Sequence, residues 1–382
     1  MKNWTSFGAR LAEQVADPDS RWRAPVASVP RHELIPRWWE RDGEGRWRLR
    51  AGAADPEAWM EAAYTDTSLV TRVGALHADH AKLDDQPEGT PTSSATMPGL
   101  VVTMLRHGRL GDGVDLLDLG TGAGGLAAYA ARRLGDQHVT SLDVDPYLTA
   151  AAEERLARFG LRPRFLATDA TAEIPGSYDR IIATVGMPAG SGLRPVLGAL
   201  RVGGRLVATL ARTTIILTGW KQADGDVVGI VERDLAGFMS TRSGDGDDGS
   251  PALADLLGHA RQADGEVTTG RYPVLDVSRT WELRTMLEIA APGTEAHFRQ
   301  EGQQRTTCLI HPDGSWARAC AEWTDQPTVH QGGPQRLWSV LERIRHRLNM
   351  EGALPLLGAR VRITGDGVVH LSRGKWSATM GH

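Results

Sequence analysis

A glycine-rich turn flanked by acidic residues has the composition of a site for a charged small molecule. The stretch DLLDLGTGAGG spans Asp115 to Gly125, and the run LAAYAARRL follows it. The apolar residues before the turn predict a strand, and those after it predict a helix. Glycines let such a turn bend sharply and approach a ligand without Cβ clashes. HVTSLDV predicts the next strand and leads to Asp143, 25 residues after Asp118. A carboxylate at this spacing is suited to accept hydrogen bonds from the two hydroxyls of a ribose.

Further segments repeat the alternation of strand and helix. RFLAT precedes Asp169, YDRIIATVG begins at Tyr178, and residues 193–210 combine a helix, a Gly203-Gly204 turn and a strand. This order predicts a mostly parallel sheet covered by helices. The turn reads Gly-x-Gly-x-Gly and lacks the third glycine in the register of a pyrophosphate-binding fingerprint, which makes a nicotinamide dehydrogenase the less favoured alternative.

Composition narrows the possible partners and compartments. The 382 residues carry a net charge of −4 and are 41% hydrophobic, which is typical of a globular enzyme and argues against a nucleic-acid partner. Cys308 and Cys320 are too few for a disulfide framework, and two strand-core thiols are favoured over a metal site. No signal peptide or membrane-spanning run is expected, so the predicted location is cytoplasmic.

The complete series of segments resembles the class I S-adenosylmethionine-dependent methyltransferases. The resemblance implies an α/β fold with a Rossmann-like, mostly parallel seven-stranded sheet. It also implies S-adenosyl-L-methionine as cofactor and S-adenosyl-L-homocysteine as product. Asp118 and Gly120 to Gly124 would line the methionine side, Asp143 would hold the ribose, and Asp169 would cap the adenine amine. The cofactor-binding residues expected by this resemblance are Asp118, Gly120, Thr121, Gly122, Gly124, Asp143, Val144, Asp169, Ala170 and Thr184.

Three segments before the glycine turn resemble protein-L-isoaspartate O-methyltransferases. They are VPRHELIP (29–36), EAAYTDTSLV (61–70) and SSATMPGLVVTML (93–105), and the resemblance extends from about residue 20 to 242. In that family a hydroxyl residue two positions before a proline helps to hold the substrate carboxylate. Thr96 occupies this place, with Ser94 two residues earlier, although the loop is longer than in the family and has Thr where Ser is usual.

The hydroxyl residues Ser93, Ser94 and Thr96 are therefore the candidate catalytic residues. Methyl transfer to a carboxylate needs no strong general base, because the carboxylate is already ionised at neutral pH. The alternative is that the serines only cap a helix that starts near Pro98. His77, His80 and His107 are nearby in sequence but are expected to be structural or solvated.

The sequence predicts two domains. After an initial helix, residues 1–60 are expected to be irregular, residues 79–93 are expected to form a loop, and TTCLIHPDGSWARACAEW is expected to form two strands around an Asp313-Gly314 turn. Residues 1–242 form the catalytic domain (1–110 on the substrate side, 111–242 around the cofactor), 243–251 form a linker, and 252–382 form a small α+β domain. Repair enzymes are expected to end near residue 242 or to have a different tail. The C-terminal segments SWARACAEW and VHQGGPQRLWSVLE resemble a subgroup of actinobacterial peptide-maturation methyltransferases, which accompany lanthipeptides and ATP-grasp-crosslinked peptides (graspetides).

That resemblance implies a function in the biosynthesis of ribosomally made peptides. The enzyme would methylate an aspartate of a modified precursor peptide, and the ester would cyclise to an aspartimide, which either persists or hydrolyses to isoaspartate. An isoaspartate repair enzyme and a non-catalytic peptide-binding subunit are the alternatives. The sequence leaves the oligomeric state open.

The C-terminal region has two possible roles. The 12 tryptophans lie outside residues 60–219 and suit either small cores or a peptide-binding groove. Residues 334–350 predict a helix with one apolar stripe, while Arg336, Arg343 and Arg347 lie off it. The region either recognises the peptide or packs on the catalytic domain and stabilises it.

Overall fold

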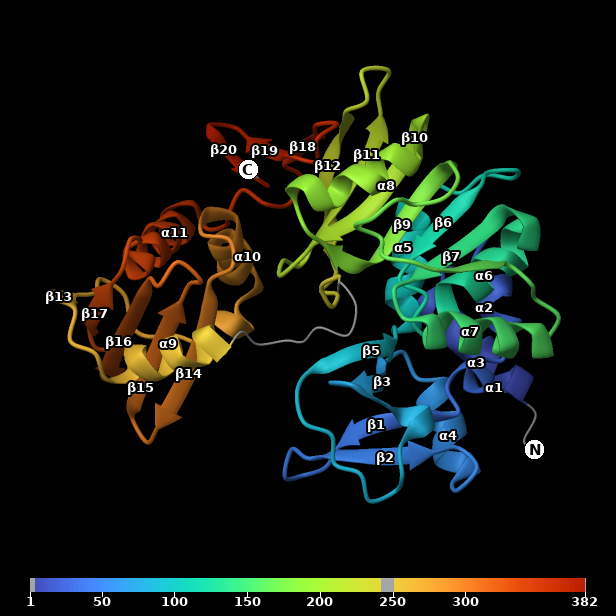
Figure 1. The fold of residues 1–382 in the computed structure, drawn as a ribbon, viewed down its shortest axis with the longest axis horizontal. Helices are drawn as coiled ribbons and strands as arrows, with labels where there is room; N and C mark the ends of the chain where they lie inside the picture. The colour runs from blue at the N-terminus through green and yellow to red at the C-terminus, as the bar shows by residue number, and fades with distance from the viewer. Residues whose placement is uncertain (1–3, 242–250, 382) are drawn as a thin grey trace.

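Three β-sheets organise the computed structural model, which describes residues 4–241 and 251–381 (Figure 1). We call them the N-terminal sheet (strands within residues 37–95), the central sheet and the C-terminal sheet (strands within residues 266–332). The central sheet has ten strands, and each of the others has five.

The central sheet contains the expected seven-stranded arrangement. Seven of its strands have the order β12-β11-β10-β9-β6-β7-β8, in which β10, β9, β6, β7 and β8 run parallel, β11 pairs antiparallel with β10, and β12 pairs antiparallel with β11. The fold class predicted from the sequence is thus confirmed. The strands are β6 (Leu116–Leu119), β7 (Val139–Asp143), β8 (Arg164–Ala167), β9 (Tyr178–Met187), β10 (Leu200–Leu210), β11 (Ile215–Lys221) and β12 (Val227–Leu235).

Three strands from the end of the chain extend this sheet beyond β12. They are β18 (Arg360–Ile363), β19 (Val369–Arg373) and β20 (Trp376–Met380), and β18 pairs with β12 with Val227 opposite Ile363. Figure 1 shows these red strands beside β12, from which they are distant in sequence. The expected boundary at 252–382 is therefore wrong for residues 360–380. An edge strand has unpaired backbone groups, and β18 pairs with those of β12.

Helices surround the parallel strands and connect them. The helix predicted after the glycine turn is α6, whose N-terminal residues follow Gly124 directly. Helix α5 leads into β6, and the expected helix between residues 193 and 200 is present as α8. The elements are α5 (Pro98–His107), α6 (Gly125–Leu134), α7 (Pro146–Arg158) and α8 (Arg194–Ala199), with short 3₁₀ turns η2 (Asp136–His138) and η3 (Gly190–Leu193).

The N-terminal region contains more regular structure than its sequence suggested. Residues expected to be irregular form a hairpin in which Trp39 lies opposite Leu49, and both of these side chains are buried, whereas Glu40 and Arg50 beside them are exposed. The elements are α1 (Trp4–Val15), α2 (Arg23–Ala27), α3 (Arg31–Leu34), β1 (Arg37–Arg41), β2 (Trp47–Ala51), α4 (Pro56–Ala63), β3 (Leu69–Val73), β4 (Leu76–His77), η1 (Ala78–His80) and β5 (Pro91–Ala95). Strand β5 occupies part of the expected 79–93 loop.

The C-terminal sheet has the order β13-β17-β16-β15-β14, and all its pairs are antiparallel. The predicted hairpin at Asp313-Gly314 is present as β15 and β16, and the predicted apolar stripe of α11 packs inward, with Leu337 and Leu341 fully buried. Most of the expected linker, residues 243–250, lies outside the described residues, and Pro251 begins α9. The elements are α9 (Pro251–Gln262), β13 (Glu266–Thr269), η4 (Val277–Arg279), α10 (Trp281–Ala290), β14 (Glu295–Glu301), β15 (Gln304–Ile310), β16 (Trp316–Glu322), β17 (Thr328–Gly332) and α11 (Leu337–Glu351).

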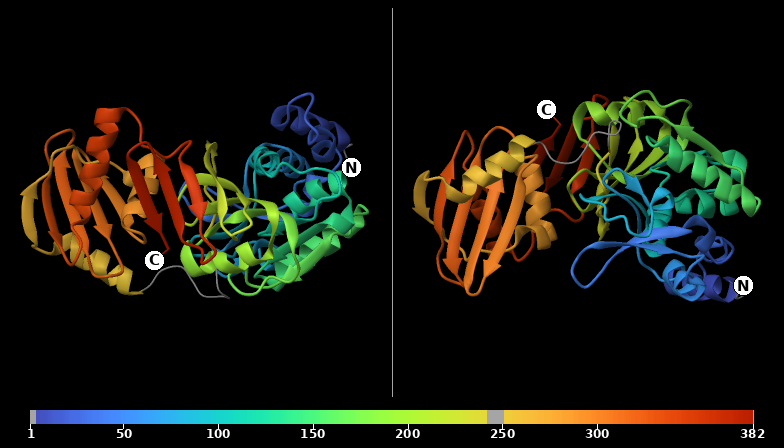
Figure 2. Two further views of the ribbon diagram at one scale, coloured as in Figure 1. Left: turned by 90° about the horizontal axis from the view of Figure 1, so that it is seen from above. Right: turned by 60° about the horizontal axis from the view of Figure 1, so that its bottom comes forward.

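The C-terminal sheet and its helices pack against the central sheet (Figure 2). One continuous apolar cluster joins Leu210 and Leu217 of the central sheet to Leu287 of α10. Thr214 and Thr285 share a buried hydrogen bond of 3.2 Å between their hydroxyls. Arg212 binds Glu288 at 3.1 Å. These contacts support the packing alternative for this region.

Most tryptophans serve the cores of the flanking regions. Trp22, Trp38, Trp39, Trp47, Trp316 and Trp338 are buried, whereas Trp323 is 46% exposed. This distribution agrees with the interpretation that small flanking units need large side chains to fill their cores. Among the helices of residues 4–241 and 251–381, none has the length and apolar character needed to cross a membrane.

Candidate active site

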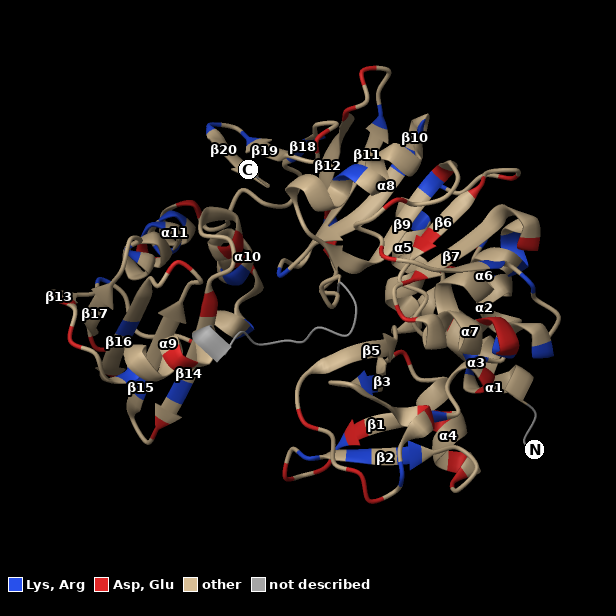
Figure 3. Cartoon of the chain, in the orientation of Figure 1, with Lys and Arg blue, Asp and Glu red and all other residues tan. Residues whose placement is uncertain are grey.

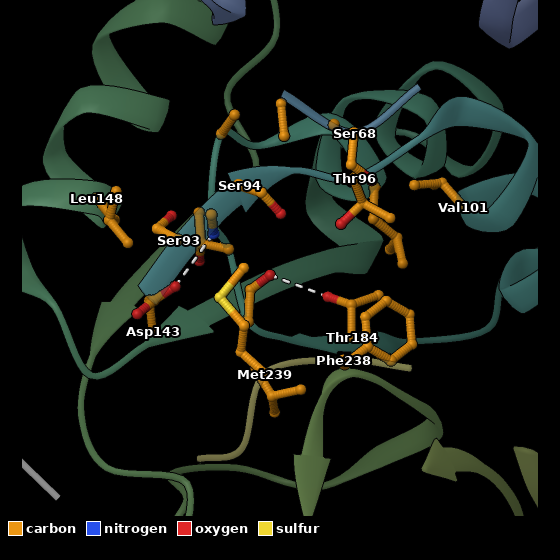
Figure 4. A pocket seen from close by; sticks show the side chains of 18 of the residues that line it. Ser68, Ser93, Ser94, Thr96, Val101, Asp143, Leu148, Thr184, Phe238 and Met239 are labelled. Carbon is orange, nitrogen blue, oxygen red and sulfur yellow. Dashed lines mark hydrogen bonds between the residues drawn. The ribbon is translucent and has the colours of Figure 1, made fainter. Parts of the chain in front are cut away.

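A cavity of about 300 Å³ lies at the carboxyl ends of the parallel strands, where open α/β sheets bind their ligands. The N-terminal sheet contributes β3 and β5 to its wall, and the segment after β12 contributes Gly237 to Thr241 (Figure 4). The sequence-predicted residues that line it are Ser93, Ser94, Thr96, Gly120, Thr121, Gly122, Asp143, Val144, Asp169, Ala170 and Thr184. The tertiary structure thus brings together residues from across the first 184 positions.

The glycine turn fits closely between two neighbours. Gly122 has a φ of 51°, and a Cβ at this position would lie 3.0 Å from the backbone oxygen of Ser94. Gly124 has a φ of 85°, and a Cβ there would approach Ala152 and Leu156 of helix α7. Gly122 therefore allows β5 to approach the turn, while Gly124 serves helix packing and is not part of the cavity wall, which differs from its expected role.

Two carboxylates end neighbouring strands on the cofactor side. Asp143 accepts hydrogen bonds from the backbone N–H of Gly122 at 3.0 Å and of Asp145 at 3.1 Å, so its side chain is held in one orientation. Asp169 follows β8, and its Oδ1 accepts from the backbone and hydroxyl of Thr171. The apolar residues Val144 and Ala170 follow the two acids and line the same cavity. This arrangement is suited to a nucleoside, because the polar edges of the nucleoside can bind the two acids while its apolar face packs against the apolar residues beside them.

Asp118 differs from its expected position. The sequence placed it on the methionine side, but its side chain is fully buried at the end of β6 and lies behind the cavity wall. Ser141 donates a hydrogen bond to its Oδ2 at 2.8 Å. Burial raises the pKa of Asp118 to about 8, against the lowering effect of the Ser141 hydrogen bond and with a smaller increase from the charge of Asp143. We therefore expect the Asp118 carboxyl to be neutral and to support the glycine turn from its buried side.

The three candidate hydroxyl residues all line the cavity, and the helix-capping alternative is wrong. Ser93 and Ser94 lie on β5, and no side-chain hydrogen bond comes from the residue that caps α5, Met97. Asp66 instead accepts from Gly99 N at 2.7 Å. Figure 4 shows the Ser94 and Thr96 hydroxyls pointing toward the space beside Thr184 and Met239. Ser93 is more enclosed, since its hydroxyl accepts from Thr71 at 3.0 Å.

Sequence reasoning missed a buried cation at the cavity. Arg31 lies in the VPRHELIP segment, is 4% exposed and lines the pocket. Its guanidinium donates to the carbonyl oxygens of Ala63, Thr67, Ala95 and Thr96. Burial lowers the pKa of Arg31, although an arginine remains charged at neutral pH. Arg31 thus fixes the end of β5 and adds positive potential. The apolar residues around it in sequence, Val29, Leu34 and Ile35, were the available signal.

A second missed element is the segment after β12. Gly186 N donates to Met239 O at 2.7 Å, and Thr241 N donates to Gly186 O at 3.0 Å, so the segment runs along the end of β9. Phe238, Met239 and Ser240 line the cavity there. Thr184, also on β9, donates to Gly120 O at 3.1 Å and thus supports the glycine turn. No local pattern marked residues 237–241, because their place depends on the long-range pairing with β9.

The histidines and cysteines of the described residues do not line the cavity. Burial lowers the pKa of His77 to about 4, and its ring packs edge-on against Tyr147. His107 binds Asp234 at 2.8 Å on the surface. Cys308 and Cys320 lie on neighbouring strands β15 and β16, as the strand-core interpretation predicted. Within the part of the chain that the structure describes, no group of His, Cys, Asp and Glu is arranged to hold a metal ion.

Comparison with known proteins identifies a methyltransferase domain in the core of the chain. The family model described as "Methyltransferase domain" matches residues 116–204, which contain β6 to β9, the start of β10 and the glycine turn. Ribosomal protein L11 methyltransferase of Thermus thermophilus is 41% identical over 108 residues, covering 28% of this chain and 41% of the relative. Protein-L-isoaspartate O-methyltransferase of Thermococcus onnurineus is 32% identical over 128 residues, covering 32% of this chain and 57% of the relative. The chain spans only 41%, 25% and 63% of the first three curated relatives.

A solved structure shows that the whole architecture has a precedent. It is described as a protein-L-isoaspartate O-methyltransferase, has a TM-score of 0.52 and 16% identity, and covers 97% of this chain and 99% of its own. At this identity the likeness concerns the fold alone. It extends through the C-terminal sheet, so the arrangement of all three sheets also occurs in that solved structure.

Proposed function

We propose that this chain, which has the class I S-adenosylmethionine-dependent methyltransferase fold, is an O-methyltransferase that esterifies the side-chain carboxylate of an aspartate in a peptide. The finer proposal is that the peptide is a ribosomally made, already modified precursor. The observation that carries the first part is the substrate side of the cavity, where hydroxyl groups and the buried Arg31 meet without a general base.

The cavity residues fit S-adenosylmethionine. Asp143 is fixed by two backbone donors and would hold the ribose hydroxyls, while Asp169 would hold the adenine amine between Val144 and Ala170. The close approach of Gly122 to Ser94 O leaves a backbone cradle for the amino acid part. When bound, the cofactor supplies an electrophilic methyl group on a sulfonium.

The side chains around the reacting space favour a carboxylate as the nucleophile. Among the described lining residues there is no histidine, lysine, glutamate or cysteine. Burial raises the pKa of Tyr129 to about 12, so its phenol stays neutral and does not act as a base at neutral pH. An amine substrate would need to lose a proton first, whereas a carboxylate is ready to react. The protein's contribution is then to align the carboxylate and exclude water.

Ser94 and Thr96 are placed to align this carboxylate. Their hydroxyls face the cavity, and Arg31 binds the backbone carbonyl oxygens of Ala95 and Thr96. The positive charge of Arg31 favours an anionic group nearby. Ser93 supports the same strand through Thr71.

The finer proposal of a modified precursor peptide rests on the altered 89–98 segment and on the C-terminal sequence resemblance. An isoaspartate repair enzyme is the second candidate, supported by the likeness in sequence and fold to proteins of that name. A non-catalytic peptide-binding subunit is disfavoured by the intact arrangement of the glycine turn, Asp143 and Asp169.

The test compares two peptides and two variants. With a lanthipeptide or ATP-grasp-crosslinked peptide that contains a normal aspartate, we expect a methyl gain followed by loss of methanol in mass spectra, and little reaction with short linear isoaspartyl peptides.

Ser94→Ala combined with Thr96→Val should lower turnover about tenfold or more, since each lost hydrogen bond costs about 0.5–1.5 kcal/mol. The matched control Ser372→Ala lies on β19, far from the cavity. Efficient reaction of linear isoaspartyl peptides would favour the repair enzyme, and no methyl transfer to either would favour the non-catalytic subunit.

A further inference from the structure

Arg72 and Asp145 form a buried ion pair between two walls of the cavity. Arg72 lies on β3 of the N-terminal sheet, and Asp145 lies in the turn between β7 and α7. The Nη1 of Arg72 is 2.9 Å from Oδ2 of Asp145, and their side chains are only 10% and 15% exposed. Breaking such a buried pair is costly, so the contact resists separation of the two walls.

Asp145 also binds Asp143 on the cofactor side of the cavity. Its backbone N–H donates to Oδ1 of Asp143 at 3.1 Å, while Oδ2 of Asp143 accepts from Gly122. Its own Oδ1 caps α7 by accepting from Tyr147 N at 2.9 Å. The position of Asp145 therefore helps to set the orientation of the carboxylate that would hold the ribose.

Arg72 lies beside β5 on the substrate side of the cavity. In the pairing of β3 with β5, Arg72 lies opposite Ser93 and Val70 lies opposite Ser94. The neighbouring Thr71 hydroxyl donates to Ser93. A displacement of Arg72 would thus move the strand that holds the candidate substrate-binding hydroxyls.

A second contact keeps the two walls together when the ion pair is removed. Tyr147 donates to Oδ2 of Asp79 at 2.8 Å, and Arg155 of α7 binds the same carboxylate. Arg155 also donates to Leu34 O at 3.1 Å. Loss of Arg72 should therefore loosen the link without detaching the N-terminal sheet.

We propose that the Arg72–Asp145 pair couples occupation of the ribose site at Asp143 to the placement of β5. Arg72 and Asp145 are positioning residues: ligand binding stabilises the orientation of Asp143, Asp145 transmits that orientation to Arg72, and Arg72 holds β5 in register. The inference rests on the cofactor part of the proposed function and is independent of the methyl acceptor.

Amide hydrogen exchange of residues 92–95 tests the coupling, with S-adenosylhomocysteine as the probe. In the wild type, saturating probe should slow exchange of these amides by about tenfold or more. In Asp145→Asn and in Arg72→Met, the slowing should fall below about threefold. Asparagine at position 145 keeps an oxygen that can cap α7. Calorimetry verifies that each variant is saturated with the probe. Arg72→Lys should restore part of it.

Arg158→Met is the matched control, because Arg158, on the same helix, is half exposed and pairs with the exposed Glu154 at 2.6 Å and more distantly with Glu33 at 4.0 Å. It should show the wild-type slowing. If β5 is protected equally in Asp145→Asn and the wild type, or is not protected in the wild type at all, the coupling does not exist. If methyl transfer to aspartyl peptides fails while the coupling is observed, only the substrate part of the proposed function falls.

Discussion

The N-terminal and C-terminal sheets are both five-stranded and antiparallel, yet they meet the central sheet in different ways. The N-terminal sheet reaches the carboxyl ends of the parallel strands, where β5 lines the cavity and Arg72 binds Asp145. The C-terminal sheet packs through α10 and Thr214, and none of the described cavity-lining residues belongs to it. We therefore expect substitutions in the two sheets to have different effects. Substitutions in the N-terminal sheet should alter ligand binding, and those in the C-terminal sheet should alter stability.

The largest expected effect is on the stability contributed by the C-terminal sheet. Leu341 of α11 is fully buried, so Leu341→Ala should lower the free energy of unfolding by about 2–5 kcal/mol. Affinity for S-adenosylhomocysteine should remain at the wild-type value. Denaturant unfolding and calorimetry measure the two quantities, and a parallel loss of affinity would contradict the separation of roles.

The next prediction concerns the buried Asp118 behind the cavity wall and the dependence of folding stability on pH. The Asp118 carboxyl has an ordinary pKa of 3.8, which burial raises to about 8 in the folded chain. Between these values the unfolded chain has released the proton and the folded chain keeps it, so wild-type stability falls as pH rises, by at most about 1.4 kcal/mol per pH unit. Asp118→Asn lacks this titration. Its melting temperature relative to the wild type should therefore rise between about pH 5 and about pH 7, and a constant difference would show that Asp118 is ionised.

A smaller effect is expected on the cofactor side of the same cavity. Asp143→Ala should weaken binding of S-adenosylmethionine by about 1–3 kcal/mol, because the ribose hydroxyls would lose their acceptor. Asp276→Ala is the control, since Asp276 is an acidic cap in the C-terminal region that accepts from Ser278 N. Calorimetry of both variants should show a loss only for Asp143, and equal affinities would remove Asp143 from the binding site.

The smallest effect is expected for the basic residues of α11, which Figure 3 marks. Arg347 already pairs with Glu351, Arg336 pairs with Glu266, and Arg343 is exposed. Reversing the charges of Arg343 and Arg347 should change stability by less than about 0.5 kcal/mol. The Michaelis constant for the peptide should stay unchanged at low salt if this region only packs. A clear increase would restore the peptide-recognition role and weaken the contrast between the two sheets.

Local patterns were sufficient for much of the molecule. The glycine turn, its flanking strand and helix, the Asp313-Gly314 hairpin and the apolar stripe of α11 each depend on residues close in sequence, and each was predicted. Periodic apolar residues and turn-forming glycines act over a few positions, so their structural consequence can be deduced without knowing the rest of the chain.

Long-range pairing decided the rest. The sequence by itself determined a Rossmann-like core with acids at the ends of its strands. It did not determine that β18 would pair with β12, that Ser93 and Ser94 would lie on a strand instead of capping α5, or that Asp118 would be buried. These outcomes depend on which distant segments meet, because a strand's own pattern shows which face is buried but not which edge it joins. Arg31 and the Arg72–Asp145 pair show the same limit: a charged residue is recognised as buried and partnered only when the chain has brought its partners to it.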